Sequence, residues 1–288
     1  MVLNEVIAEH TVAPETSDTA YRYLVGVFEE LPSRKQVKKA LHAGRIKING
    51  AVANQLSRVE GGDLVELFAD AKPIPVLKIK MDVLFEDDHF AIVFKPGGIR
   101  TNGNASQTLE RALPFNLKID EHYRPRAVHR LDEATSGLVL CAKTPKATKE
   151  LSDLLANREV KKTYIALASG KITEATTVEG NVDRKEATTI ITPIKSYTWH
   201  DEQFTFVECQ PLTGRKHQIR LHLEKIGCPI FGDPKYGKKT TLKGRGMYLT
   251  AIALAFTHPF TGEDLNVRAE LPGKFKTIMR FLEGKARR

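Results

Sequence analysis

The sequence predicts an α+β protein with a small N-terminal domain and a larger second domain, whose mixed or antiparallel sheet is flanked by helices and loops. Segments that alternate apolar and polar residues, as strands do, are interspersed with helical patterns and show no repeating period. The 288 residues are enough for two domains. The segment ADAKPIPVLKIK has two prolines and little periodicity, which predicts domains over 1–70 and 81–288 joined by a linker over 71–80.

The composition indicates a folded protein, because 41% of the residues are apolar. No run approaches the roughly 20 apolar residues that a membrane helix needs. The first residues, MVLNEVIAEHTVAPE, contain acids and no signal-peptide pattern, so we expect a cytoplasmic protein without a membrane partner. Cys141, Cys209 and Cys228 are far apart and form no C-x-x-C pair, which predicts reduced packing residues.

The charge balance points to a polyanionic partner. The formal net charge is +9, and excess Lys and Arg give proteins a salt-dependent affinity for phosphates. Nucleic acid is therefore the leading expectation, with a merely basic soluble protein as the alternative. The distribution of the charge decides between them.

The charge is clustered in the N-terminal domain, where SRKQVKKALHAGRIKI contains no acid. Ser33 predicts a helix start, Val37, Ala40 and Leu41 share one face, and Gly44 predicts the helix end. Asn49-Gly50 then predicts a tight hairpin turn. A basic helix beside a hairpin suits phosphate binding, and a solvated charged face is the alternative. The candidate RNA-binding residues are Arg34, Lys35, Lys38, Lys39, Arg45 and Lys47.

The second domain carries most of the strand signals. Strands are predicted within 83–95, 136–144, 161–170, 188–199 and 204–212. Thr144-Pro145 predicts the start of a helix whose Leu151, Leu154 and Leu155 line one face.

One segment of this domain, AVHRLDEATSGLVL at 127–140, places Asp132 before a small-residue turn and an apolar strand. A carboxylate held at a pocket edge is able to act as a nucleophile or a base. Arg130 and His129 are predicted to be cations that keep it ionised. The alternative is an ordinary turn aspartate that caps the backbone.

A second segment, LTGRKHQIRLHLEKIGCPIFGDPKYG at 212–237, predicts a short helix that is rich in cations and suits an anion. Metal binding is disfavoured, because His217 and His222 are poorly spaced as ligands and no acid joins them. Gly232-Asp233 and Tyr236-Gly237 are interpreted as turn residues. Lys216 and Arg220 are predicted to share one face of this helix, and Ile219, Leu223 and Ile226 the opposite, buried face. The residues predicted to share the helix are Arg215, Lys216, His217, Arg220 and His222.

Two resemblances unite these observations. LPSRKQVKKALHAGRIKING and VEGGDLVEL resemble S-four-type RNA-binding domains. HRLDEATSGLVL, KKTYIALASG and the segment at 212–237 resemble the motifs of RluA-type RNA pseudouridine synthases, a likeness that covers nearly the whole chain.

The second resemblance implies isomerisation of specific uridines in structured RNA by base flipping, without a cofactor. It implies that Asp132 attacks the uridine, that Arg220 pairs with this carboxylate, and that Arg130 fills the gap left in the RNA. Tyr164 would pack against the base or take the ribose 2′ proton. Ribosomal RNA is the favoured substrate and transfer RNA a possible one, with no obligate protein partner. His129, Arg215 and Lys216 are further candidates for RNA binding.

Three other functions stay open at this point. A non-catalytic RNA-binding or ribosome-assembly protein would use the basic patch alone. A glycosidic hydrolase would combine Asp132 with Glu133 and release uracil. A metal-dependent nuclease would need divalent ions and would shorten the RNA.

Overall fold

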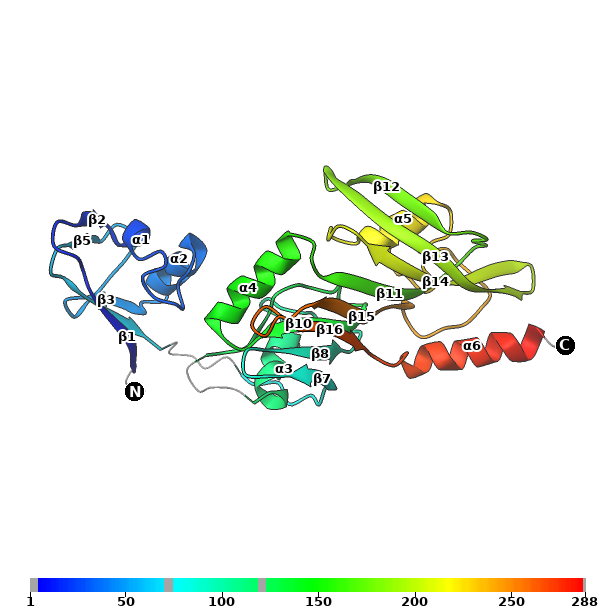
Figure 1. Ribbon diagram of the computed structural model, residues 1–288, viewed down its shortest axis with the longest axis horizontal. Coiled ribbons are helices and arrows are strands. Elements are labelled where there is room, and N and C mark those ends of the chain that lie inside the picture. The colour runs from blue at the N-terminus through cyan, green and yellow to red at the C-terminus, as the bar shows by residue number, and fades with distance from the viewer. Residues whose placement is uncertain (1–4, 70–74, 119–122, 287–288) are drawn as a thin grey trace. The chain divides into compact units, whose positions relative to one another are not determined.

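The computed structural model describes residues 5–69, 75–118 and 123–286 (Figure 1). The chain divides into two compact units, Met1–Pro75 and Val76–Arg288. Residues 71–74 of the predicted linker lie outside the described residues. The segment that follows packs on the larger unit, since the Leu77 amide donates to the Arg111 carbonyl at 2.8 Å and Ile79 contacts the unit's core. Its apolar side chains make it part of a packed unit rather than a free linker.

The smaller unit surrounds its own core with short strands and two helices. Its main sheet has the order β1-β6-β3-β4, and β2 pairs separately with β5. The elements are β1 (Val6–Thr11), β2 (Ser17–Thr19), α1 (Ala20–Tyr23), α2 (Arg34–His42), β3 (Ile46–Ile48), β4 (Ala51–Val52), β5 (Arg58–Glu60) and β6 (Leu64–Phe68).

Helix α2 and the hairpin after it follow the sequence prediction. Val37, Ala40 and Leu41 are buried in the core of the smaller unit, at the spacing of one helix face. Ser33 occupies the N-cap position, although its hydroxyl donates to the Gln36 side chain at 2.6 Å instead of accepting from the backbone. After the helix, Gly44 has a φ of 67°, which suits a residue without a Cβ. The β3–β4 turn falls on residues 49–50, as predicted.

The larger unit is built on one mixed sheet, which confirms the predicted α+β class (Figure 1). The described strands run β12-β13-β14-β11-β15-β10-β8-β7, with β16 beside β15 and β9 beside β10. Only β10 and β15 pair in parallel among these described strands. The strands are β7 (Val83–Glu86), β8 (Phe90–Lys95), β9 (Arg126–Ala127), β10 (Ser136–Ala142), β11 (Lys161–Ala168), β12 (Thr176–Val182), β13 (Lys185–Trp199), β14 (Glu202–Pro211), β15 (Leu249–Thr257) and β16 (Asp264–Arg268).

Helices cover the two faces of this sheet. Apolar residues of α3 (Leu109–Asn116) and α5 (Gln218–Lys225) share a core with one face of the central strands. Those of α4 (Pro145–Ala156) and α6 (Gly273–Ala286) share a second core with the other face. β10 is buried along its whole length, and its successive side chains enter the two cores alternately.

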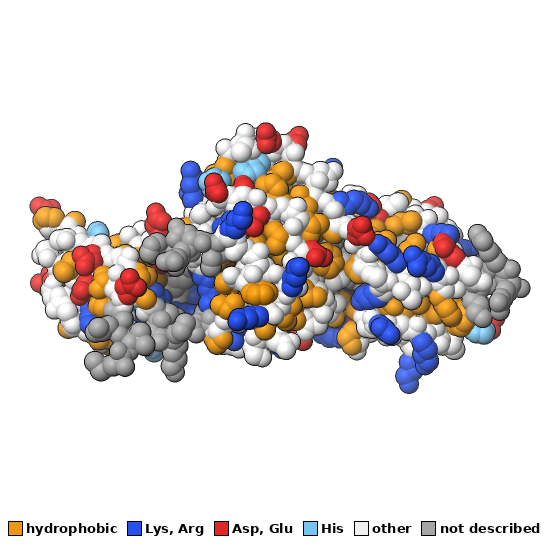
Figure 2. Space-filling view, turned by 90° about the horizontal axis from the view of Figure 1, so that it is seen from below, with side chains coloured by type: hydrophobic (Ala, Val, Ile, Leu, Met, Phe, Trp, Pro, Cys, Tyr) orange, Lys and Arg blue, Asp and Glu red, His pale blue; other side chains and the backbone are white. Residues whose placement is uncertain are grey.

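The α4 start agrees with the sequence, since the Thr144 hydroxyl accepts from the Ala147 amide at 3.0 Å. The basic segment at 274–288 forms most of α6, whose Phe275, Ile278 and Leu282 are buried against the sheet. Figure 2, seen from the side on which α6 lies, shows Lys and Arg side chains gathered over this end of the unit.

The three cysteines are free and buried, as predicted. Within the described ranges, no helix is long and apolar enough to cross a membrane.

Candidate active site

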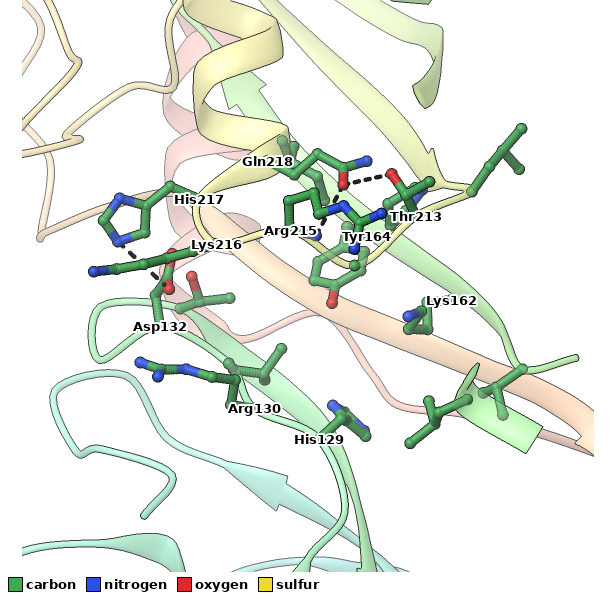
Figure 3. A pocket seen from close by; sticks show the side chains of 18 of the residues that line it. His129, Arg130, Asp132, Lys162, Tyr164, Thr213, Arg215, Lys216, His217 and Gln218 are labelled. Carbon is green, nitrogen blue, oxygen red and sulfur yellow. Dashed lines mark hydrogen bonds and ion pairs between the residues drawn. The ribbon is translucent and has the colours of Figure 1, made fainter. Parts of the chain in front are cut away.

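A cavity of about 780 Å³ opens on the sheet face that α3 and α5 cover (Figure 3). Its walls come from the loop before β10, from β11 and from the loop before α5. This volume is within the usual range for small-molecule sites. Seven Lys and Arg residues line it, whereas Asp132 is the one carboxylate among its described lining residues. The cavity therefore suits an anionic ligand and holds a single acidic group.

Hydrogen bonds from neighbouring loops anchor the loop that carries Asp132. The Thr101 hydroxyl donates to the Leu131 carbonyl at 2.9 Å and accepts from the Leu131 amide at 3.0 Å. The Glu133 carbonyl accepts from the Gly98 amide at 2.7 Å and lies 3.4 Å from the Lys95 ammonium. These bonds hold Asp132 in place before any ligand arrives, which is the preorganisation that catalysis requires.

Lys95 is fully buried and completes this support. Its ammonium also donates to the carbonyls of Pro96 and Ile99, both at 2.9 Å. Burial lowers the pKa of Lys95 to about 8, although the charges of Asp132 and Glu133 oppose that shift. Lys95 thus joins the loop after β8 to the loop of Asp132.

Gly137 fixes where β10 begins behind this loop. Its φ is 125°, and a Cβ at this position would lie 2.2 Å from the Ala251 carbonyl oxygen of β15. Only a residue without a side chain permits the parallel strand to approach this closely. Packing of the sheet therefore requires glycine at position 137 of β10.

Arg220 connects Asp132 to a second carboxylate. Its Nη1 lies 3.2 Å from Asp132 Oδ2, whereas its Nε and Nη2 donate to the two oxygens of Asp233 at 2.7 and 2.8 Å. Burial opposes the charge of Arg220, but both carboxylates raise the pKa of the guanidinium. Burial likewise opposes the charge of Asp233, and its hydrogen bonds with Arg220 and with backbone amides lower its pKa. Arg220 and Asp233 therefore form a charged pair at neutral pH.

His217 approaches Asp132 from the other side. Its Nε2 lies 3.6 Å from Asp132 Oδ1 (Figure 3). Its Nδ1 lies 3.0 Å from the Tyr236 hydroxyl. The Tyr236 ring also lies 5.0 Å from the Arg220 guanidinium, within cation–π range. Burial and the cations Arg220, Lys216 and Lys235 lower the pKa of His217, although Asp132 opposes them. The imidazole is therefore neutral at pH 7.

Tyr164 forms part of the cavity floor. It lies on β11 with 9% of its surface exposed, and Figure 3 shows its hydroxyl directed into the cavity. Burial, reinforced by the charge of Asp132, raises the pKa of this phenol. The ring presents an apolar surface with a neutral hydroxyl.

The predicted helix at 215–222 begins later than expected. α5 starts at Gln218, and Arg215, Lys216 and His217 lie in the loop before it, with His217 at a left-handed φ of 57°. Lys216 and Arg220 therefore do not share a helix face. The predicted split between an exposed cationic face and a buried apolar face is also wrong. Arg220 and His222 are as buried as Ile219, because Asp233 partners the arginine and the Thr189 hydroxyl lies 2.9 Å from His222 Nδ1.

Gln218 explains why the chain forms a loop there. Its side-chain oxygen accepts from the Thr213 hydroxyl at 2.7 Å and from the Arg215 amide at 3.0 Å. Its side-chain nitrogen donates to the Thr188 carbonyl at 2.9 Å. The turn is therefore closed on β13, which directs the side chains of 215–217 to the cavity.

Comparison with known proteins identifies the family. A family model described as RNA pseudouridylate synthase matches residues 89–225, which include the loop of Asp132, β11 and α5. An uncharacterized RNA pseudouridine synthase of Bacillus subtilis is 33% identical over 261 residues, or 83% of this chain and 86% of the relative. The chain belongs to the RluA-type RNA pseudouridine synthases. It is therefore an isomerase that converts uridine in RNA to pseudouridine.

Two further relatives span most of this pseudouridine synthase. A ribosomal large subunit pseudouridine synthase C of Rickettsia felis is 32% identical, covering 83% of this chain and 88% of its own. A ribosomal large subunit pseudouridine synthase D of Xanthomonas campestris is 30% identical, covering 90% and 87%. A human RNA pseudouridylate synthase domain-containing 4 structure shares the fold at 23% identity, with a TM-score of 0.57 over 70% of this chain and 92% of that one.

The remaining predicted site residues of the synthase differ in exposure and in the contacts that they make. Arg130 is exposed at the cavity edge, and Lys216 is exposed beside it. Arg215 donates through Nε to the Glu186 carbonyl at 3.1 Å. His129 does not supply the predicted cation, because burial and the charge of Lys162 lower its pKa to about 3. Its Nε2 instead accepts from the Leu140 amide at 3.0 Å, so the imidazole is neutral and supports the loop.

In the smaller unit, the basic residues of α2 and β3 differ in exposure. Arg45 donates to the Phe68 carbonyl at 2.7 Å, and the Lys47 ammonium lies 4.4 Å from the Phe68 ring. These two are thus partly engaged within the unit. The other four basic residues predicted to bind RNA in this unit, Arg34, Lys35, Lys38 and Lys39, are exposed.

Sequence reasoning missed four residues that build the site of this synthase. Asp233 and Tyr236 were interpreted only as turn residues, although the acid in GDPKYG follows a cationic helix closely enough to pair with it. Asp233 also accepts from two backbone amides of its turn, so it both stabilises the turn and pairs with Arg220. Lys95 and Gln218 act through contacts with backbone carbonyls and amides, which leave no pattern in a sequence.

Proposed function

We propose that this synthase modifies uridine in ribosomal RNA of the large subunit, in the cytoplasm, and that Asp132 is its nucleophile. The observation that carries the role of Asp132 is its position as the one carboxylate among the described lining residues of a cationic cavity, with Arg220 3.2 Å away. Two relatives are named as ribosomal large subunit enzymes, which supports this RNA over transfer RNA.

In this mechanism the target uridine leaves its stack and enters the cavity, and Arg130 takes its place in the RNA. The cost of flipping is a few kcal/mol, offset by contacts with the phosphates. Asp132 then attacks the nucleotide, and its other oxygen stays oriented by Arg220. The bond between the ribose and uracil nitrogen one breaks, and uracil turns within the cavity and rejoins the ribose through carbon five. Asp132 is released, and the proton of carbon five passes to solvent.

Tyr164 is proposed to pack against uracil while it turns. The raised pKa of the phenol favours this role over removal of the ribose 2′ proton, since a neutral hydroxyl is a poor base. His129 acts on the RNA only indirectly, by holding the loop of Arg130.

The smaller unit is proposed to be an S-four-type RNA-binding domain. Its exposed α2 residues Arg34, Lys35, Lys38 and Lys39 form a cationic face next to the β3–β4 hairpin. Phosphate contacts of this kind raise affinity without selecting a sequence. Changing all four to Gln in the full-length chain is expected to raise KM for RNA and weaken its salt dependence.

Tritium release from RNA labelled at uracil carbon five tests the proposal. Wild type is expected to release tritium from unmodified ribosomal RNA, whereas D132A and D132N release none. E133Q is the matched control, since Glu133 is an exposed carboxylate that pairs with Arg100 outside the cavity.

Each rival function gives a different result. Release from transfer RNA alone would overturn the ribosomal substrate. Free uracil whose formation needs Glu133 would indicate a hydrolase, and shortened RNA in the presence of divalent ions would indicate a nuclease. Undiminished release by D132N would exclude Asp132 as the nucleophile.

A further inference from the structure

Lys162 is a half-buried cation of the cavity that has no anionic partner among the described residues. Lys162 lies on β11 two residues before Tyr164, and both residues line the cavity. Figure 3 shows both side chains at the cavity, with His129 nearby. The Lys162 ammonium lies 3.7 Å from where a Cβ of Gly214 would be, which puts it beneath the loop before α5.

Lys162 forms no ion pair with any described residue. Over the described ranges, no carboxylate or carbonyl oxygen bonds its ammonium. The nearby His129 ring is neutral, and its Nε2 is occupied by the Leu140 amide. Burial lowers the pKa of Lys162, and no neighbouring charge opposes this shift. By contrast, Arg220 forms ion pairs with two carboxylates, so Lys162 and Arg220 differ in function.

A half-buried ammonium without a partner is unfavourable until an anion arrives. Uracil and ribose are neutral, and the only anions that RNA carries are its phosphodiesters. A uracil carbonyl would accept a hydrogen bond from Lys162 but would leave the charge uncompensated. A phosphate satisfies both requirements.

We propose that Lys162 forms a phosphate subsite, which binds a phosphodiester that flanks the flipped uridine. The inference rests on the proposed function, since it takes the cavity of Asp132 as the site that receives this nucleotide. Lys162 thus binds a phosphate of the RNA backbone from inside the cavity, while Asp132 and Arg220 act on the nucleotide itself. The subsite positions the target ribose before any bond forms or breaks. Its loss should therefore weaken substrate binding, which KM and Kd measure.

Full-length K162Q and K162R test the subsite, with K149Q as the matched control. Lys149 is an exposed lysine of α4 that does not line the cavity. KM and kcat would be measured by tritium release from an unmodified large-subunit ribosomal RNA transcript at several KCl concentrations. Kd for the same transcript would be measured by filter binding.

K162Q is expected to raise KM about tenfold, the effect of losing one charge-assisted hydrogen bond. The slope of log KM against log KCl should become shallower by about 0.7, the value for one phosphate contact in single-stranded RNA. K162R keeps the charge and should stay within about threefold of wild type, and K149Q should match wild type. K162Q should also melt at the same or a higher temperature, because it removes an unpaired half-buried charge.

An unchanged KM for K162Q would overturn the subsite. So would a higher KM with an unchanged salt slope, or a loss confined to kcat, since each would indicate contact with a neutral part of the nucleotide. A lower melting temperature would show that Lys162 has a partner in the free protein. If wild type released no tritium from any RNA, the proposed substrate would fail, and the Kd values with their salt slopes would still decide the role of Lys162.

Discussion

Asp233 holds Arg220 more closely than the proposed nucleophile does. Its two oxygens accept from the guanidinium at 2.7 and 2.8 Å, whereas the contact between Arg220 and Asp132 is 3.2 Å. The side chain of Asp233 is fully buried, and that of Asp132 is 17% exposed. Asp233 therefore orients the arginine, and the arginine in turn orients the carboxylate that reaches the cavity.

Replacing this partner should impair both activity and stability. D233N removes the charge that neutralises Arg220, and leaving a buried charge without its partner costs about 3–5 kcal/mol. We expect kcat to fall at least about tenfold as the guanidinium turns toward Asp132. Tritium release and urea unfolding measure the two effects. D201N, at an exposed turn, is the control, and wild-type kcat in D233N would contradict the positioning role.

The acid side of the pH profile should depend on His217. Because burial and the surrounding cations lower the pKa of His217, this ring takes up a proton only below pH 6.5, its ordinary pKa. Protonation adds a second cation beside Asp132 and should weaken its attack. We expect kcat/KM to fall as the pH drops below 6.5.

The charged and titratable groups around His217 are Asp132, Arg220, Lys216, Lys235 and Tyr236. H217N should abolish this fall, whereas H200N, at an exposed position, should retain it. A fall that begins above pH 6.5, or that persists in H217N, would contradict the assignment.

Gly137 should not tolerate a side chain. In G137A the new Cβ would meet the Ala251 carbonyl oxygen, and the backbone φ of 125° would itself be strained. We expect destabilisation of more than about 3 kcal/mol in thermal unfolding, since the strand cannot move aside without opening the sheet. G284A in α6 meets no atom within 4 Å and should be neutral or stabilising. Equal melting temperatures of G137A and wild type would show that β10 and β15 are able to separate.

Removing Lys95 should loosen the loop of Asp132. K95M leaves the carbonyls of Pro96, Ile99 and Glu133 without this donor, at about 1–3 kcal/mol for each buried group left unpaired. We expect a lower melting temperature and a lower kcat with RNA affinity retained in filter binding. K171M, at an exposed lysine, should behave as wild type. Unaltered kcat in K95M would show that Thr101 alone suffices to hold the loop.

Local signals in the sequence predicted much of this fold. The N-cap Thr144, the apolar face of α2 and the Asn49-Gly50 turn act within a few residues, so they are readable without knowledge of the tertiary structure. β15 was missed. It is a buried apolar strand without polar alternation, and its place beside β10 depends on a glycine more than a hundred residues away.

The site was predictable where its residues belong to a recognisable sequence motif. Asp132 and Arg220 were found through their motifs, and the structure places them together. The charge of His129 was predicted wrongly because burial decides its protonation, and burial is a property of the fold. The start of α5 was predicted too early because the amide of Gln218 binds the preceding loop, a contact that helix propensity does not represent.

The double pairing of Arg220 has a consequence for charge during turnover. In the proposed mechanism Asp132 loses its negative charge when it attacks the nucleotide, and an arginine with no other partner would then be left as an isolated cation inside the protein. Asp233 keeps Arg220 neutralised at that moment, so the enzyme never holds an uncompensated charge there. When Asp132 is released, it regains its charge beside an arginine that has not moved, and the site is ready for the next uridine.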